Sequence, residues 1–152
     1  MSTRRDMLAT SLKVAGLLAA AGMLPRAAQA AWNTAAFEAK NLADAVKAFG
    51  GSAPAASTGV SITGPDIAEN GAVVPVGCAS TLPGVKRLML LVEKNPNALA
   101  AVFDLTDSVE PSINARVKMA QSSNVYAVAM TGDGKVFYAQ KEIKVTLGGC
   151  GR

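Results

Sequence analysis

Short segments with alternating apolar residues, separated by turn residues about every ten positions, fill the chain from residue 60 to residue 147. The clearest example is residues 113–119, where Ile113, Ala115 and Val117 alternate with Asn114 and Arg116. A period of two places successive side chains on opposite faces of a strand, so one face can enter a core while the other meets water. The pattern therefore predicts an all-β domain built from many short strands.

The predicted strands cover residues 60–62, 72–79, 85–93, 98–105, 113–119, 125–130 and 136–147. Pro75 cannot donate a ladder hydrogen bond, so its segment is expected to be an edge strand or to contain a bulge. Residues 85–93 are almost continuously apolar, which favours a central strand, and the sequence Gly132-Asp133-Gly134 predicts a hairpin turn. About seven strands with regular turns predict an immunoglobulin-like antiparallel β-sandwich.

One amphipathic helix is predicted in front of the strands, from Thr34 to Phe49. The apolar positions that recur there at helical spacing are Phe37, Leu42, Val46 and Phe49. Charged residues occupy the remaining positions, as expected for a helix that packs one face on a sheet. The pair Gly50-Gly51 is a suitable end for this helix.

Residues 1–30 resemble an export signal of the twin-arginine type. Arg4 and Arg5 precede an apolar stretch at 14–24, and the small-residue sequence 28–30 resembles a cleavage site. The apolar stretch has 11 residues, whereas a membrane-spanning helix needs ~20, so no stable membrane insertion is expected. An ordinary secretory signal is the alternative. Either signal predicts a periplasmic protein, with a carrier domain at 31–147 and a tail at 148–152.

The charge and the residue types of the mature chain limit its chemistry. Residues 1–30 hold four basic residues and one acidic residue, so the totals of 15 and 11 fall to 11 and 10, a net charge of +1. A chain this close to neutral offers no track for nucleic acid. The chain contains no histidine, which removes Ser-His-Asp and Cys-His catalysis and most zinc, copper and haem sites. We therefore expect a protein that is not an enzyme and holds no metal or other cofactor.

The C-terminal tail carries a cysteine between glycines, in the sequence Gly148-Gly149-Cys150-Gly151-Arg152. Glycine has the widest choice of backbone dihedral angles, so Gly148, Gly149 and Gly151 are predicted to make a flexible arm. Such an arm can carry the thiol of Cys150 into a narrow channel of another protein. Arg152 is a candidate aid to anionic cargo, although the terminal carboxylate of the same residue opposes it. The tail thus predicts covalent attachment of cargo at Cys150.

Cys78 is the second cysteine of the chain, so a structural disulfide is one alternative to the carrier interpretation, and a disulfide between two molecules is a possible resting form of the carrier. Exported proteins form disulfides, so Cys78 could pair with Cys150, or the Cys150 thiols of two molecules could pair in a resting form. Cys78, however, shares a strand face with Val74 and Val76. We therefore predict that Cys78 is a small buried apolar residue and that Cys150 is the reactive thiol.

Three segments of the mature chain and the leader arginines resemble the SoxY family, the sulfur-carrier subunits of the bacterial thiosulfate-oxidising (Sox) system. The segments are IAENGAVVPV at 67–76, RVKMAQSS at 116–123 and VTLGGCGR at 145–152. The family tail usually ends Gly-Gly-Cys-Gly-Gly, and this chain has Arg152 in the last place. The resemblance extends over essentially the whole chain, and the tail is its most specific part.

The resemblance implies a role and a set of partners. A haem cytochrome would couple thiosulfate oxidatively to the Cys150 thiol, a hydrolase would release sulfate, and a sulfur dehydrogenase would oxidise the remaining sulfane sulfur. The family works in a complex with SoxZ, a small β-sandwich subunit without the cysteine arm. Two other functions stay open on sequence grounds: an exported thiol redox enzyme, and a plain β-sandwich binding module whose tail is incidental.

Overall fold

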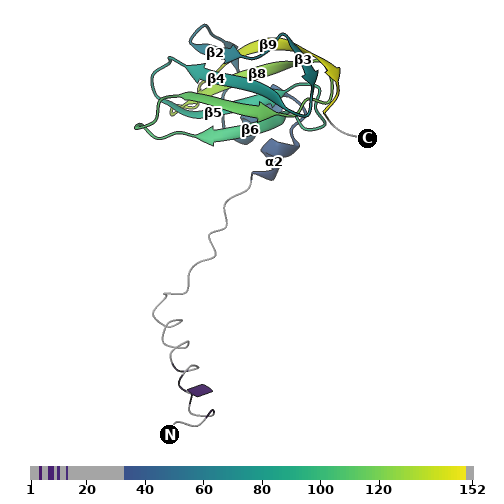
Figure 1. Ribbon diagram of the computed structural model, residues 1–152. Helices are drawn as coiled ribbons and strands as arrows, with labels where there is room; N and C mark the ends of the chain where they lie inside the picture. Colours follow the sequence, from purple (N-terminus) through teal and green to yellow (C-terminus); the bar gives the residue numbers. More distant parts are fainter. Residues whose placement is uncertain (1–3, 5–6, 9, 11–12, 14–32, 150–152) are drawn as a thin grey trace. The chain divides into compact units, whose positions relative to one another are not determined.

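The computed structural model describes residues 4, 7, 8, 10, 13 and 33–149, and the chain divides into two units, Met1–Trp32 and Asn33–Arg152 (Figure 1). In the first unit the five described residues are helical. The apolar stretch and the cleavage site of the predicted export signal lie outside the described residues. None of the helices in the described part has the length and apolar character needed to cross a membrane.

The second unit contains two short helices followed by nine strands within residues 33–149. The helices are α2 (Thr34–Glu38) and α3 (Leu42–Ala48). The strands are β1 (Ala55–Ala56), β2 (Val60–Thr63), β3 (Ile67–Asn70), β4 (Val74–Ser80), β5 (Val85–Val92), β6 (Leu99–Asp104), β7 (Ser112–Val117), β8 (Ser123–Thr131) and β9 (Val136–Leu147).

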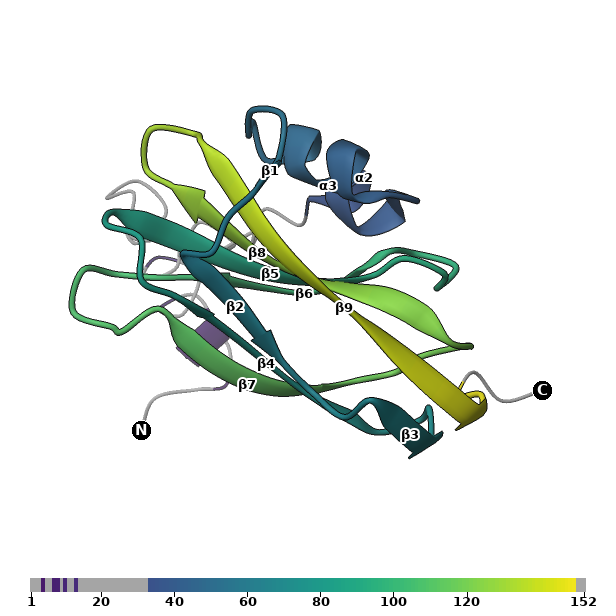
Figure 2. The ribbon, with the colours of Figure 1, turned by 90° about the horizontal axis from the view of Figure 1, so that it is seen from above.

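The strands form two sheets that face each other (Figure 2). The small sheet has the order β2-β4-β7, and the large sheet has the order β1-β9-β8-β5-β6, with β3 also paired to β9. The predicted immunoglobulin-like β-sandwich is confirmed, and all seven predicted strands are present. The sequence pattern missed two short strands, β1 and β3, which both run parallel to β9.

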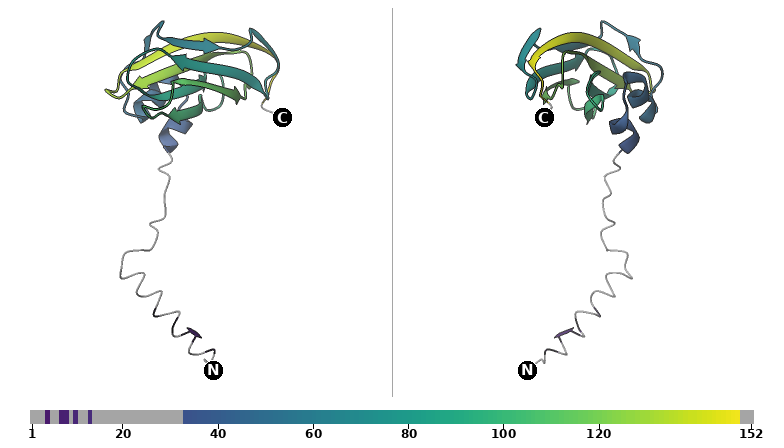
Figure 3. Two further views of the ribbon diagram at one scale, coloured as in Figure 1. Left: turned by 60° about the vertical axis from the view of Figure 1, so that its left-hand side comes forward. Right: turned by 90° about the vertical axis from the view of Figure 1, so that its right-hand side faces the viewer.

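The large sheet is buried on both faces, which explains the continuous apolar run in β5. Leu88 and Leu90 point into the core between the two sheets, whereas Met89 and Leu91 point into a second core beneath the helices. All four side chains are fully buried. Figure 3 shows the helices against the outer face of this sheet. A strand covered on both sides needs no polar face, so its sequence does not alternate.

The single helix predicted from Thr34 to Phe49 is wrong: the segment forms two short helices with a break at residues 39–41. The carbonyl oxygen of Ala39 accepts a hydrogen bond from the amide of Ala98 at 2.9 Å instead of a helical one. Asn41 then caps α3, because its side chain accepts a hydrogen bond from the amide of Asp44 at 2.9 Å. Tertiary pairing with the segment before β6 thus overrides the local helical pattern.

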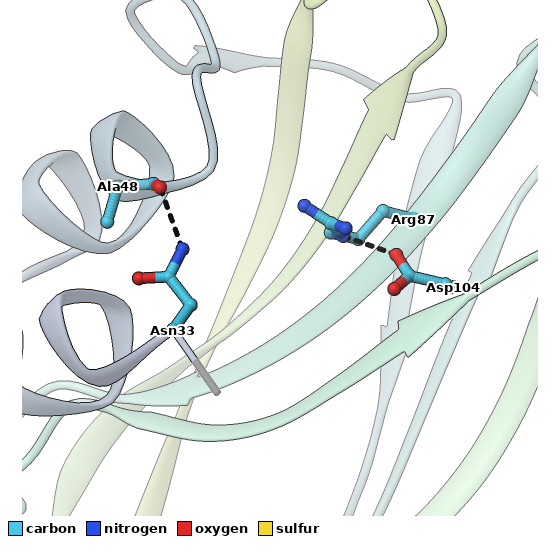
Figure 4. A network of polar contacts seen from close by, with 4 residues as sticks. All are labelled: Asn33, Ala48, Arg87 and Asp104. Carbon is cyan, nitrogen blue, oxygen red and sulfur yellow. Dashed lines mark hydrogen bonds and ion pairs between the residues drawn. The ribbon is translucent and has the colours of Figure 1, made fainter. Parts of the chain in front are cut away.

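Polar contacts hold the helices to each other and the neighbouring strands together (Figure 4). The Asn33 side chain donates to the carbonyl oxygen of Ala48 at 2.8 Å, which links the start of α2 to the end of α3. Arg87 pairs with Asp104 across β5 and β6 at 2.5 Å. The same guanidinium lies 4.3 Å from the ring centroid of Phe49, directly after α3. Arg87 therefore joins the helical layer to the sheet.

Pro75 lies in β4, the middle strand of the small sheet, and the register of β4 with β7 is continuous through it, so the prediction of an edge strand or a bulge is wrong. Pro75 itself nevertheless lies where β4 has a neighbouring strand on one side only. The pairing of β2 with β4 extends from Val60 opposite Ser80 only to Thr63 opposite Gly77, whereas β7 continues to Val117 opposite Val74. Pro75 is thus paired with β7 and not with β2. On the unpaired side, the missing amide of Pro75 costs no hydrogen bond.

Candidate functional site

The last four residues of β9, before the predicted arm, extend past the end of β8. The pairing of β8 with β9 ends at Ser123 opposite Ile143. From Lys144 to Leu147, β9 is held on its other edge by β3, with Asn70 opposite Leu147 (Figure 2). On the free side, the amide of Val145 donates to the Ser122 hydroxyl at 2.9 Å. The end of β9 is therefore fixed from both sides.

Three backbone hydrogen bonds continue this arrangement into the tail. The amide of Gly71 donates to the carbonyl oxygen of Leu147 at 2.7 Å, and the amide of Met119 donates to the carbonyl oxygen of Gly71 at 2.7 Å. The amide of Gly149 then donates to the carbonyl oxygen of Met119 at 2.8 Å. These four residues form a closed backbone contact, which we call the tail clamp.

The clamp glycines Gly71 and Gly149, and Gly148 between Leu147 and Gly149, are required because backbone packs directly on backbone at each of them. A Cβ atom on Gly71 would lie 2.3 Å from the Met119 carbonyl oxygen and 2.7 Å from the Gly149 nitrogen. A Cβ on Gly149 would lie 2.1 Å from the Gly71 carbonyl, and a Cβ on Gly148 would lie 2.3 Å from the Ala120 carbonyl oxygen. Each distance is too short for any side chain, and none of these glycines has a positive φ. Close approach, not an unusual dihedral angle, therefore accounts for them.

The structure describes part of the predicted site. Gly148 and Gly149 are at the tail clamp, while Cys150, Gly151 and Arg152 lie outside the described residues. The flexibility predicted for the arm glycines stays a prediction, as does the role of Arg152. The clamp nevertheless gives Gly148 and Gly149 a second reason to be glycine that the sequence did not indicate.

Sequence reasoning missed Gly71, Met119 and Ser122 as residues of this site. The available signal was Gly71 itself, since an isolated glycine next to a strand pattern often marks a close backbone approach. A turn places it there: the amide of Ala72 donates to the Asn70 side chain at 2.8 Å. The three segments quoted for the family resemblance thus meet in space at the base of the tail, through residues 67–76, 116–123 and the described part of the last segment, 145–149.

Cys78 lies in the core between the sheets and is 1% exposed, packed with Val74 and Val76. Its thiol is free, and the prediction of a small buried apolar residue is confirmed. Burial raises the pKa of this thiol to about 12, because the thiolate cannot be solvated there, and a hydrogen bond from the Val128 backbone only partly offsets the effect. Cys78 is therefore a poor nucleophile.

The described residues provide no cluster of three or more His, Cys, Asp and Glu side chains that could hold a metal ion. Two exposed carboxylates at and after the end of β6 contact basic side chains instead. Asp107 pairs with Lys86, just as Asp104 pairs with Arg87.

A family model and one solved structure identify the same family. The family model described as sulfur oxidation protein SoxY matches residues 45–150. Among solved structures, the sulfur carrier protein SoxY from Chlorobium limicola f thiosulfatophilum is similar at 35% identity and a TM-score of 0.60, covering 67% of this chain and 92% of the other.

A more distant likeness concerns the fold alone. A superoxide reductase (neelaredoxin) from Ignicoccus hospitalis aligns with 20% identity and a TM-score of 0.51, over 57% of this chain and 78% of its own. No curated protein sequence matches the chain.

Proposed function

The chain belongs to the SoxY family of sulfur oxidation proteins, and on that premise we propose that it carries sulfur intermediates of thiosulfate oxidation as covalent adducts on Cys150. A sulfur-carrier role follows from the family itself. The attachment residue, the cargo and the partner enzymes are the proposal. The observation that supports it most is that the sequence has Cys150 directly after Gly149, soon after β9 ends at Leu147, whose side chain is 66% exposed.

The proposed chemistry keeps the sulfur on the carrier through successive steps. The Cys150 sulfur forms a bond to the sulfane sulfur of thiosulfate, while a proton and an electron pair leave, the electrons passing to a haem cytochrome of the system. Water then attacks the terminal sulfone sulfur, the bond between that sulfur and the sulfane sulfur breaks, and sulfate departs with release of protons. A persulfide remains on Cys150, and a sulfur dehydrogenase oxidises its outer sulfur, with water supplying the oxygen atoms, the dehydrogenase accepting the electrons and protons being released.

A carrier that supplies only the thiol, with catalysis left to partner enzymes, agrees with the residue content of the chain. The thiolate is the nucleophile of such chemistry, yet the chain has no histidine to act as a general base. Cys78 is buried with its pKa raised to about 12, so it cannot compete for the cargo. The catalytic groups therefore belong to the partner enzymes, and the carrier supplies a single accessible thiol.

The proposal also includes a location and a permanent partner. The leader with Arg4 and Arg5 supports export to the periplasm by the twin-arginine route, where Sox-type chemistry would take place. The family resemblance supports a heterodimer with a SoxZ-type β-sandwich subunit. Transient docking of the cytochrome, the hydrolase and the dehydrogenase then occurs at the end of the domain that bears the tail.

The test compares two single-cysteine variants in cells that respire on thiosulfate. Cys150→Ser is expected to abolish thiosulfate-dependent oxygen uptake, whereas the matched control Cys78→Ala retains it. Normal oxygen uptake in Cys150→Ser would refute the attachment site. Thiol-dependent turnover by the isolated protein would support a redox enzyme instead, and full function after deletion of residues 148–152 would support a plain binding module.

A further inference from the structure

A cavity of about 320 Å³ opens on the outer face of the large sheet, next to the start of α3. Its floor is apolar, because the lining residues Leu91 and Ala98 are buried. Leu42 and Tyr126 are half-buried and form its walls, and Glu93 is exposed at its rim. The volume corresponds to about ten water molecules, which is room for one long side chain.

The polar groups of this cavity are the Glu93 carboxylate and the Tyr126 hydroxyl. The side-chain amide of Asn124 donates to the Glu93 carboxylate at 3.0 Å and so orients it. Burial raises the pKa of the Tyr126 hydroxyl, and the negative charge of nearby Glu93 raises it further. The Tyr126 ring is held edge-on against Tyr138, with the ring centroids 5.8 Å apart. An oriented carboxylate beside an aromatic ring and an apolar floor favours an organic cation.

Arg87 shows, on the same face of the sheet, how a ring and a carboxylate bind a guanidinium. Its guanidinium lies 4.3 Å from the ring centroid of Phe49, and it pairs with the Asp104 carboxylate (Figure 4). Glu93 and Tyr126 offer the same two groups. Within residues 33–149, however, no Lys or Arg forms an ion pair with Glu93 or lies over the Tyr126 ring.

Lys40, directly before the N-cap of α3, does not supply this cation either. Its ammonium donates to the carbonyl oxygen of Pro96 at 2.7 Å and to the side chain of Asn97 at 2.8 Å. The described part of the chain therefore leaves the Glu93 carboxylate available to a cation of another molecule.

The cavity lies at the end of the domain that bears the tail. The amide of Glu93 donates to the carbonyl oxygen of Asn124 at 3.0 Å. Ser122, two residues before Asn124, accepts a hydrogen bond from the amide of Val145 near the end of β9. A protein that docks at this end can therefore place a side chain in the cavity, and the negative rim favours a basic one.

We propose that the cavity binds an arginine side chain of a partner protein, with the guanidinium between the Glu93 carboxylate and the Tyr126 ring. The aliphatic part of that arginine lies on Leu91 and Ala98. Arginine suits the site better than lysine, because its planar guanidinium stacks on a ring and donates two parallel hydrogen bonds to a carboxylate. The site recognises a protein and takes no part in the sulfur chemistry at Cys150.

The first measurement is an NMR titration of the full mature chain with N-acetyl-L-arginine amide, which mimics an arginine within a protein. The control ligand is N-acetyl-L-citrulline amide, which has nearly the same shape and no charge. We expect saturable shifts of the amides at 91–98 and 126 with the arginine derivative, and binding at least about fivefold weaker with the citrulline derivative. Equal binding of the two ligands, or no saturable shift with either, would overturn the proposal.

Two variants test the two groups of the cavity separately. Glu93→Gln and Tyr126→Leu are each expected to weaken the binding of the arginine derivative at least about fivefold. The matched control Glu142→Gln removes an exposed carboxylate opposite Asn124 on β9 and should leave the affinity unchanged. Equal effects of the two glutamate substitutions would mean a general attraction by surface charge and would overturn the site. Because Glu93 is exposed, Glu93→Gln decides this point even where Tyr126→Leu fails to fold.

A last measurement tests whether the arginine belongs to a partner protein. Calorimetric titrations compare the natural chain and Glu93→Gln with each proposed partner, the SoxZ-type subunit and the three enzymes. We expect Glu93→Gln to weaken the binding of at least one partner about fivefold. Unchanged affinity for every partner would overturn the protein source, and so would tighter binding of the arginine derivative by Arg152→Gly, which would show that the chain's own arginine competes. The titrations with partners alone rest on the proposed function: if no adduct forms on Cys150, the arginine titration still decides the cavity.

Discussion

The burial of Cys78 predicts that the native protein has one reactive thiol, although it contains two cysteines. The ordinary pKa of such a thiol is 9.0, and in the folded domain that of Cys78 rises to about 12. At pH 8 the thiolate fraction of Cys78 is therefore roughly one in ten thousand, against about one in ten for an unshifted thiol. The difference is about a thousandfold in reactive species, before the lack of access to a 1% exposed side chain is counted.

The assay is alkylation with iodoacetamide at pH 8, followed by intact-mass spectrometry. We expect one label per native molecule, two in denaturant, and none in native Cys150→Ser. A label on native Cys78 that appears as fast as that on Cys150 would refute the reasoning, because it would mean that the inter-sheet core is open to solvent.

The raised pKa of Cys78 also predicts that the free energy of unfolding depends on pH. The thiol ionises more easily in the unfolded chain, so the stability that neutral Cys78 contributes is complete below pH 9 and is lost as the pH rises toward 12. At pH 10 the loss is about 1 kcal/mol. Urea unfolding of the natural sequence and of Cys78→Ala at pH 8 and pH 10 measures it. Equal losses in the two proteins would contradict the assignment to Cys78.

Three further predictions follow from the fold and the site. Asn41→Ala removes the cap of α3 and should lower the free energy of unfolding by about 1 kcal/mol in urea titration, whereas no loss would show that the cap is dispensable. Arg87→Leu removes the contacts to Phe49 and Asp104 and should also cost about 1 kcal/mol; an unchanged midpoint would contradict a link between the layers. Val73 is 55% exposed beside the clamp, so Val73→Asp should raise the KM of the processing enzymes several-fold. The control is Val109→Asp, at a similarly exposed valine beyond the opposite end of β7, which should leave the KM unchanged. Equal effects of the two substitutions would argue against docking at the clamp.

The sequence predicted the sandwich well because its evidence is local. Alternation in β7 and the apolar run of β5 report directly which faces are buried. The helix at 34–49 failed because the carbonyl of Ala39 pairs with Ala98, a residue 59 positions away. The strand β3 was missed because its partner is the far end of β9, and four residues with mixed polarity give no periodic signal.

In the candidate site, too, local features could be predicted from the sequence, whereas contacts between distant segments could not. A cysteine between glycines at the chain end can be read from sequence, and so can the burial of Cys78 on a face with Val74. The tail clamp cannot, because it consists of backbone hydrogen bonds between three separate segments. Gly71 looks like an ordinary turn glycine until the fold places it against Gly149.

The most direct test of the carrier role is the mass of the C-terminal peptide from protein that has been processing thiosulfate. Trypsin cleaves after Lys144 and leaves residues 145–152, a peptide whose one cysteine is Cys150, while Cys78 falls in a different peptide. We predict sulfur-containing adducts on the 145–152 peptide that a thiol reductant removes. An unmodified 145–152 peptide during active thiosulfate oxidation, or adducts confined to the peptide with Cys78, would contradict the account.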